Sequence, residues 1–315
     1  MRLLRPALNE RAPRMTVFLS IAATAGLGAL LAAGIAGATY AGRNGRIAIV
    51  EHGAGGVQIW TVLPDGSSPQ QLTTTGFNAT PSFSRDGKQI AYLSDQGAGG
   101  QYEIWVMNAD GTNAHQLTHL HGDAGFPDFS PTGARILFAG HSAANRNDDI
   151  YTVKANGTGL TRLTQDLGNN QQPVYSPDGR RIAFVSDRTG VSQVWVMNAN
   201  GSHATQVTKD KVTHFVVDWS PDGRRLVYDD GNPGTPTAIV VSNTDGSGHR
   251  MLTHGGTRDF GPRWSPDGRQ IAFVRVFGFS SGVAQETYVM NADGTHQHLL
   301  HKGAKQLTPA WQPLP

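Results

Sequence analysis

Tyr175-Ser176-Pro177-Asp178-Gly179 is one of five copies of a phrase that combines an aromatic residue, Ser, Pro, Asp and Gly, two of them with one substitution. The copies begin at Phe83, Phe129, Tyr175, Trp219 and Trp264. Their serines are separated by 46, 46, 44 and 45 residues. This period fits one four-stranded blade of a β-propeller and is longer than a leucine-rich repeat. The repeat therefore predicts an all-β propeller.

Two turns are predicted in each repeat. Pro presets the backbone angle of the first turn and Gly closes it, so the phrase predicts a type I turn between antiparallel strands. An apolar run such as residues 182–185 follows each copy and is typical of a strand. A second turn ends at Gly66, Gly111, Gly157, Gly201, Gly246 and Gly294, between an aromatic-rich strand and one that ends in Leu or Val. Each unit thus has four strands.

The second turn occurs six times and the first only five times, which predicts how the ring closes. Residues 46–50 match a second strand that has no first strand ahead of it. Residues 308–311, Thr-Pro-Ala-Trp, match residues 80–83, Thr-Pro-Ser-Phe. We therefore predict a six-bladed β-propeller over residues 43–315, in which the C-terminal strand completes blade one and leaves the sheet edges protected.

Residues 1–42 are predicted to form a separate signal peptide or membrane anchor. Four Arg and one Glu precede a stretch without charge over residues 15–42, long enough for a transmembrane helix. Residues 36–38 and 39–41 both resemble cleavage sites, so an uncleaved anchor and a cleaved signal remain alternatives. In both cases the arginines stay cytoplasmic, and the propeller is extracytoplasmic, in the periplasm or at the cell surface.

Charge and cysteine content exclude several classes of function. Without residues 1–42 the chain has 22 basic and 23 acidic residues, because four of the 26 and one of the 24 are removed. No basic face is expected, so nucleic acid is excluded as a partner. The chain contains no Cys, which excludes disulfides, thiolate metal sites and a cysteine nucleophile.

Two paired signatures resemble the WD-type repeats of the TolB propeller family. They are Ser-Pro-Asp-Gly followed by Ile-Ala-aromatic, at residues 176–185, and Ile-Trp-Val-Met-Asn-Ala-Asp-Gly-Thr, at residues 104–112. The resemblance spans residues 45–315 and implies a scaffold. TolB proteins are periplasmic parts of the Tol-Pal system with an N-terminal α/β domain, for which this sequence shows no pattern. Related propellers gate serine peptidases or, with seven blades, act as oligogalacturonate lyases.

No catalytic residue is predicted. Residues 278–282, Gly-Phe-Ser-Ser-Gly, match the nucleophile elbow, but that motif needs a strand-to-helix turn and a downstream Asp and His. The match lies in a loop of blade six, with 33 residues after it and no α/β pattern. We expect a binding protein without a cofactor.

No metal site is predicted either. Histidines cluster at His115, His119 and His121, and at His296, His298 and His301. The first group is expected at the ends of one outer strand and in the next loop. His296 and His298 are expected to share a strand face without an obvious third ligand. The pairs Asp148-Asp149 and Asp229-Asp230 provide too few oxygens for calcium, and their flanks suit polar turns.

Three charged residues stand in an inner-strand column that other blades fill with Ser82, Val174 or Ala310. They are Asp128, Asp218 and Arg263. Since a lone buried charge is costly, we expect Asp218 and Arg263, in adjacent blades, to pair near the central channel.

Because successive strands of a blade run in opposite directions, both repeated turns are predicted to lie on one rim of the propeller. The blade-to-blade connections and the loops between second and third strands then lie together on the other rim. The variable segments 94–100, 141–148, 229–237 and 277–285 belong to that second rim. Function resides in such loops more often than in regular turns. The candidate ligand-binding residues at its channel mouth are Asn78, Asp123, Asn170, His214, Arg258, Asp259, Lys305 and Gln306.

Polar side chains that converge on a concave mouth can orient a peptide, a protein tail or a glycan. The leading hypothesis is a monomeric, non-enzymatic propeller that binds an envelope protein or peptide there. Solvated loop ends without a ligand are the alternative for these residues. A second functional hypothesis is a glycan-binding or glycan-cleaving propeller with a metal held by His214 and Asp259. A third is a structural part of an envelope assembly.

Overall fold

The computed structural model describes residues 42–53, 56–97, 99–120, 122–142, 147–165, 168–232, 235–277, 285–303 and 306–315. Residues 1–41 of the predicted leader, His121, the Gly-Phe-Ser-Ser-Gly segment and Lys305 lie outside these ranges. No helix within them is long and apolar enough to cross a membrane.

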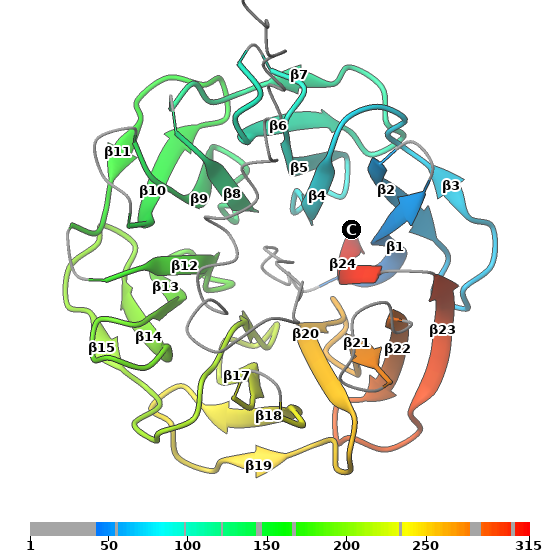
Figure 1. Ribbon diagram of the computed structural model, residues 1–315, viewed down its shortest axis with the longest axis vertical. Helices are drawn as coiled ribbons and strands as arrows, with labels where there is room; N and C mark the ends of the chain where they lie inside the picture. The colour runs from blue at the N-terminus through cyan, green and yellow to red at the C-terminus, as the bar shows by residue number, and fades with distance from the viewer. Residues whose placement is uncertain are drawn as a thin grey trace, which may run out of the picture.

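Six four-stranded antiparallel sheets are arranged around one axis (Figure 1). Blade one has β24 (Gln306–Leu314), β1 (Arg43–Gly53), β2 (Gly56–Val62) and β3 (Gln70–Gln71), and blade two has β4 (Asn78–Phe83), β5 (Gln89–Ser94), β6 (Glu103–Asn108) and β7 (His115–Gln116). Blade three has β8 (Ala124–Phe129), β9 (Arg135–Gly140), β10 (Asp149–Lys154) and β11 (Thr161–Arg162), and blade four has β12 (Asn170–Tyr175), β13 (Arg181–Ser186), β14 (Gln193–Asn198) and β15 (Thr205–Gln206). Blade five has β16 (Val217–Trp219), β17 (Arg225–Asp230), β18 (Ala238–Asn243) and β19 (Arg250–Met251), and blade six has β20 (Arg258–Trp264), β21 (Gln270–Val276), β22 (Gln285–Asn291) and β23 (His298–Gly303).

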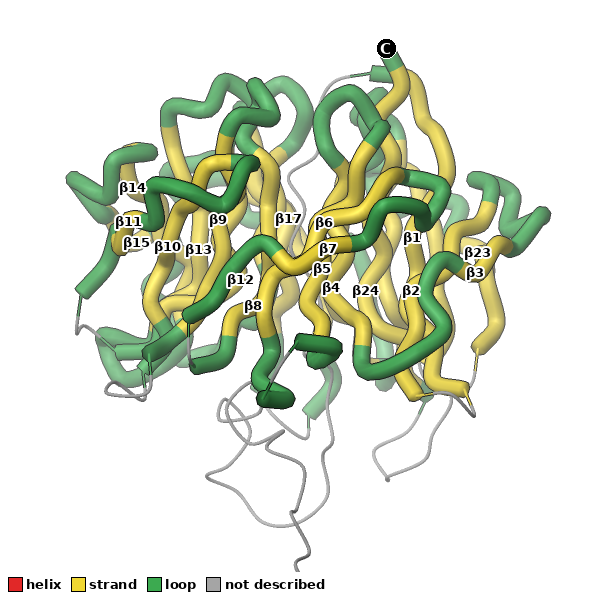
Figure 2. The backbone as a smooth tube through the Cα atoms, turned by 90° about the horizontal axis from the view of Figure 1, so that it is seen from above, coloured by secondary structure: helices red, strands yellow, loops and turns green. Residues whose placement is uncertain are grey.

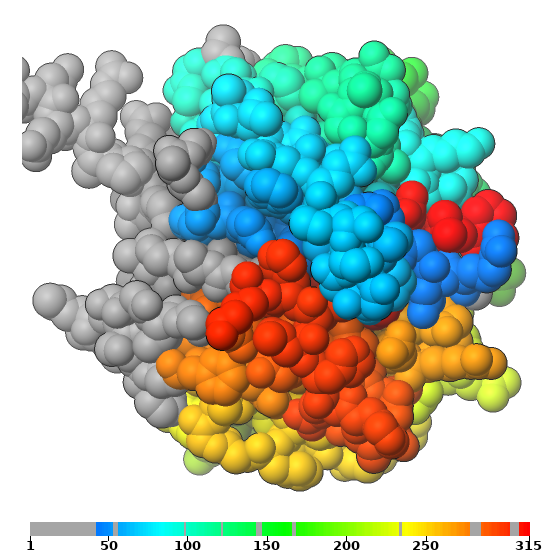
Figure 3. Space-filling model, turned by 90° about the vertical axis from the view of Figure 1, so that its right-hand side faces the viewer, coloured from blue at the N-terminus to red at the C-terminus, as the bar shows by residue number. Residues whose placement is uncertain are grey.

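The C-terminal strand closes the ring as the sequence predicts. β24 is the innermost strand of blade one and pairs with β1, with Ala310 opposite Ala48 and Trp311 opposite Ile47. Figure 3 shows the two chain segments, red and dark blue, side by side. The six-bladed, four-stranded, all-β architecture is therefore confirmed.

Both repeated turns lie on one rim, here called the turn rim. In all five copies of the first turn, the Gly N–H donates to the Ser carbonyl at 2.8 Å. The two turns of blade two contact each other directly, because the Ala109 N–H donates to the Lys88 carbonyl at 2.8 Å. The turn rim is at the top of Figure 2, where the C-terminus ends. The opposite end, here called the loop rim, carries the remaining connections.

The core lies between neighbouring blades. Trp219 and Trp264, which begin two of the repeated phrases, are fully buried in separate interblade clusters. The second turn sets the blade spacing by close backbone approach. A Cβ added to Gly66, whose φ is +80°, would lie 2.1 Å from the Leu300 carbonyl oxygen of blade six. Only glycine fits there.

Two expectations about histidines are wrong. β7 ends at Gln116, so His119 lies beyond the outer strand rather than at its end. His296 has a φ of +54° and precedes β23, so it does not share a strand face with His298. The turn ahead of β23 takes up residues that a regular outer strand would otherwise contain.

Candidate functional site

The candidate residues within the described ranges lie at the loop rim, where the inner strands begin. Asn78, Asn170 and Arg258 are the first residues of β4, β12 and β20, and the Gln306 backbone begins β24 opposite Glu51. Asp123 directly precedes β8. The remaining two, His214 and Asp259, lie shortly before β16 and within β20.

These side chains are mostly buried, which contradicts the alternative of solvated loop ends. Asn78 is fully buried, and its Nδ2 donates to the Thr75 carbonyl at 2.7 Å and to Gln58 Oε1 at 3.1 Å. Asn170 is also fully buried, and its Oδ1 accepts a hydrogen bond from Arg188 Nη2 at 2.6 Å. Both amides therefore fix the base of a loop.

His214 is fully buried between two acceptors. Its Nδ1 lies 3.0 Å from the Asp229 carbonyl oxygen and its Nε2 lies 3.2 Å from Asp210 Oδ1. The ring also packs edge-on against Tyr228, with centroids 5.2 Å apart. Both ring nitrogens are thus engaged, and His214 ties the connection between blades four and five to β17.

Asp229 connects the inner strands of blades five and six. Its carboxylate accepts hydrogen bonds from the backbone N–H groups of Phe215 at 2.8 Å, Val216 at 3.0 Å and Gly261 at 3.2 Å. Burial raises the pKa of Asp229, and these hydrogen bonds oppose the rise. Asp229 itself is fully buried within β17.

Asp259 is 1% exposed and forms a bidentate pair with Arg275, with 2.8 Å from Nε to Oδ1 and 2.8 Å from Nη2 to Oδ2. The hydrogen bond to this carboxylate raises the pKa of Arg275. Arg275 also stacks on Tyr288, 4.9 Å from the ring centroid. Arg258 is 4% exposed, and burial lowers its pKa.

Blade three contains a histidine–carboxylate pair at the same rim. His141 Nδ1 lies 2.9 Å from Asp148 Oδ1, and the side chains are 12% and 1% exposed. The hydrogen bond that His141 donates to Asp148 raises the pKa of His141, and the charge of Asp123 adds to the rise. Asp123 also accepts a hydrogen bond from the Tyr102 N–H at 3.1 Å. The pair brackets the connection between β9 and β10.

Across the described ranges, no group of three or more His, Asp or Glu residues is arranged to hold a metal ion.

In the other acidic pair, Asp148-Asp149, Asp149 is buried and hydrogen-bonded as Asp229 is. Asp149 accepts hydrogen bonds from Arg162 Nε at 3.0 Å and from Thr164 Oγ1 at 2.7 Å. Asp149 is buried within β10.

The charged residues of the inner column are buried together near the axis. Asp128 and Asp218 are fully buried and Arg263 is 1% exposed. Burial lowers the pKa of Arg263, and the charges of Asp218, Asp128 and Asp229 oppose this effect. Arg263 Nη1 donates to the Val217 carbonyl at 3.0 Å. The charge of Asp218 therefore acts on Arg263, but this hydrogen bond of the guanidinium goes to the backbone, and a direct pair between the two side chains stays a prediction.

Sequence reasoning missed the roles of Asp229 and Arg275, although a signal was present. Asp229 occupies a strand column that is otherwise apolar, with Val50, Leu93, Ala139, Val185 and Val274 in the other blades. Arg275 occupies the next column, which holds Ser94, Gly140 and Ser186 in three blades and Glu51 and Asp230 in the other two. A departure from an apolar column therefore marks Asp229, whereas Arg275 differs from its column only as the one basic residue in it.

Other side chains at the loop rim are open to solvent. Phe277, directly after β21, is 45% exposed and is one of few large apolar side chains exposed in the described part of the chain. Polar neighbours in the loops of other blades are also exposed, namely Gln96, Lys209, Lys211 and Asn232. This surface offers one apolar anchor among hydrogen-bonding groups.

The family model of the TolB beta propeller domain matches residues 115–315. The chain belongs to the TolB β-propeller family. It superimposes on TolB from Acinetobacter baumannii with a TM-score of 0.71 and 23% identity, covering 85% of this chain and 67% of that one. A protein described as TolB from Agrobacterium tumefaciens gives 0.59 and 22%, with coverage of 79% and 98%. These two likenesses show the fold alone.

The same fold occurs in a chain of the nidogen/laminin complex, with a TM-score of 0.66, 11% identity and coverage of 85% of this chain and 98% of that one. A search of curated protein sequences found no match. The TolB-type fold of this propeller is therefore established, and a fold does not by itself determine function.

Proposed function

We propose that this propeller is an extracytoplasmic, non-enzymatic scaffold that binds a protein or peptide of the cell envelope through its loop rim. Membership of the TolB family supports a scaffold, and the uncharged stretch in residues 15–42 supports export or anchoring in the cytoplasmic membrane. The observation that carries the proposal is the exposed Phe277, on the same rim as the exposed polar side chains named above. Exposed aromatic residues dominate the energetics of many protein interfaces.

In this proposal the buried and the exposed residues of the loop rim have different tasks. Asn78, Asn170, His214 and Asp259 hold the bases of loops, since each is buried and hydrogen-bonded within the propeller. Exposed side chains at loop tips contact the partner. Preorganised loops lower the entropic cost of binding, because fewer conformations are lost on association.

Affinity capture from solubilised envelope tests the proposal with the full chain, a Phe277→Ser variant and a Leu160→Ser variant. Leu160 is 49% exposed beside the second turn of blade three, on the turn rim, so it is a matched apolar control. We expect a captured protein whose yield falls about tenfold with Phe277→Ser, as for loss of an aromatic anchor, and is unchanged with Leu160→Ser. Equal capture by all three proteins would refute binding through the loop rim.

A further inference from the structure

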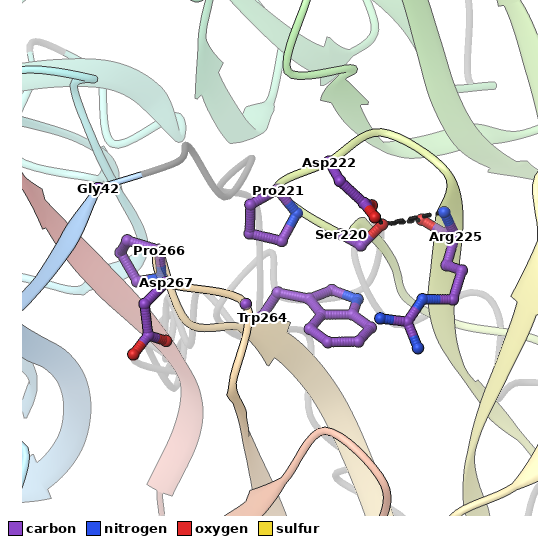
Figure 4. Close-up of a pocket in the computed structure, with 9 residues that line it drawn as sticks. Gly42, Ser220, Pro221, Asp222, Arg225, Trp264, Pro266 and Asp267 are labelled. Carbon is purple, nitrogen blue, oxygen red and sulfur yellow. Dashed lines mark hydrogen bonds between the residues drawn. The ribbon is translucent and has the colours of Figure 1, made fainter.

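A pocket of about 410 Å³ opens on the turn rim between blades five and six (Figure 4). Pro221 of one repeated turn and Pro266 of the next form its sides, and Trp264 and Arg225 extend the lining. Gly42 borders the pocket and its N–H donates to the Pro266 carbonyl at 3.1 Å. The volume is within the range of about 300–1,000 Å³ typical of ligand sites.

Arg225 stacks on a tryptophan, as Arg181 does on Trp219, but it differs from its counterparts in three other blades in its hydrogen bonds. Arg46, Arg135 and Arg181 occupy the same column, and each donates through Nη2 to a backbone carbonyl, at 3.1, 3.1 and 3.4 Å. No hydrogen bond links the Arg225 guanidinium to any described residue, and it lies over Trp264 with its Cζ 4.8 Å from the ring centroid. It is thus held in place with its donors available.

Two carboxylates flank the pocket. Asp222 and Asp267 are exposed, and each uses Oδ1 to accept from the serine hydroxyl of its own turn, at 2.5 and 2.6 Å. The second oxygen of each carboxylate makes no hydrogen bond with the described residues. One Arg and two Asp give the lining a net charge of −1. The pocket therefore favours a ligand that carries both a neutral hydrogen-bond acceptor, for Arg225, and a positive charge, for Asp222 or Asp267.

We propose that this pocket binds an extended segment of a partner protein that contains Lys or Arg. A backbone carbonyl of that segment accepts from Arg225, as carbonyls do from Arg46, Arg135 and Arg181 in the other blades. The basic side chain lies along Pro221 and Pro266 and reaches Asp222 or Asp267. This site is on the rim opposite Phe277 and is independent of the function proposed above.

A library of random linear heptapeptides, screened against the immobilised full chain, tests the site. We expect enrichment of peptides with Lys or Arg. Arg225→Lys keeps the positive charge but loses the planar guanidinium group. It is expected to lower the affinity for the enriched peptides about tenfold, as for the loss of one charge-assisted hydrogen bond. Asp267→Asn keeps the oxygen that accepts the serine hydrogen bond in the turn but loses the negative charge, so it also lowers this affinity.

Two control variants separate the pocket from other surfaces. Arg181→Lys changes the equivalent residue at the junction of blades four and five and leaves the affinity unchanged. Phe277→Ser also leaves it unchanged, so failure at this site and failure at the loop rim are distinguishable. The proposal is overturned if no peptide is enriched, if the enriched peptides lack basic residues, or if Arg225→Lys and Arg181→Lys bind them equally.

Discussion

The Asp218 carboxylate of blade five accepts a hydrogen bond from the Trp264 backbone N–H of blade six at 2.9 Å, so one side chain links two inner strands. Blade three repeats this arrangement, because Asp128 accepts from the Tyr175 N–H of blade four at 2.8 Å. Asp218 also accepts from its neighbour Trp219 at 2.9 Å. Buried carboxylates thus join adjacent blades around the axis, where the inner strands have no further strand to pair with.

Asp218→Ala is expected to lower the free energy of unfolding by about 3–5 kcal/mol, because it leaves buried N–H groups without an acceptor and removes a negative charge near Arg263. Asp218→Asn keeps an acceptor oxygen and costs less. Chemical denaturation of both variants measures the difference. A loss below about 0.5 kcal/mol for the Ala variant, the range of ordinary surface substitutions, would contradict the role of this carboxylate.

Gly66→Ala is expected to destabilise the closure between blades one and six, since the new Cβ would lie 2.1 Å from the Leu300 carbonyl oxygen. Gly133→Ala is the matched control. Its φ of +71° is similar to the +80° of Gly66, but no atom lies within 4 Å of the added Cβ. Backbone strain of about 1–2 kcal/mol applies to both variants. Thermal unfolding should show a further decrease in melting temperature for Gly66→Ala only. Equal melting temperatures of the two variants would argue against the close contact.

The His141–Asp148 pair predicts a pH-dependent contribution to stability. The pKa of His141 is raised in the folded protein by its hydrogen bond to Asp148. The pair therefore stabilises fully below the unfolded histidine pKa of about 6.5, and its contribution is lost as the pH rises through the folded value. Unfolding free energies of the native chain and of His141→Gln should differ most near pH 5.5 and converge toward pH 8. A difference that does not change with pH would contradict this pairing.

Asp259→Ala is expected to cost about 3–5 kcal/mol, because it leaves Arg275 without its bidentate partner in a largely buried position. The double variant Asp259→Ala with Arg275→Met removes both charges and should recover part of the loss. A double-mutant cycle on urea denaturation measures the coupling. Additive effects of the two substitutions would show that the pair does not act as a unit.

The sequence predicted the fold because the repeat encodes it redundantly. Five of the six blades contain the Ser-to-Gly turn, and the unmatched strand at residues 46–50 identified β24 as its partner. The alignment of the repeats was enough to predict how the ring closes. The second strand at residues 46–50 has no first strand ahead of it, and the C-terminal strand is the one first strand left to pair with it.

The sequence located the candidate residues at one rim but did not predict their surroundings. Asn78 and Asn170 are buried because the loops before β4 and β12 fold over them, and loop conformation does not follow from a strand repeat. Similarly, the acceptors of His214 come from Asp210 and Asp229, in two different segments. Whether a polar side chain is buried depends on such contacts between separate chain segments, and an alignment of the repeats does not show them.

The most direct test of binding through the loop rim is photo-crosslinking in intact cells, with benzoylphenylalanine placed at position 277 and, as a control, at position 160 of the full chain. Both native side chains are exposed, at 45% and 49%, but they lie on opposite rims. Binding through the loop rim should give a discrete crosslinked protein from position 277 that is absent from position 160. The same adducts from both positions, or an adduct from position 160 alone, would contradict it.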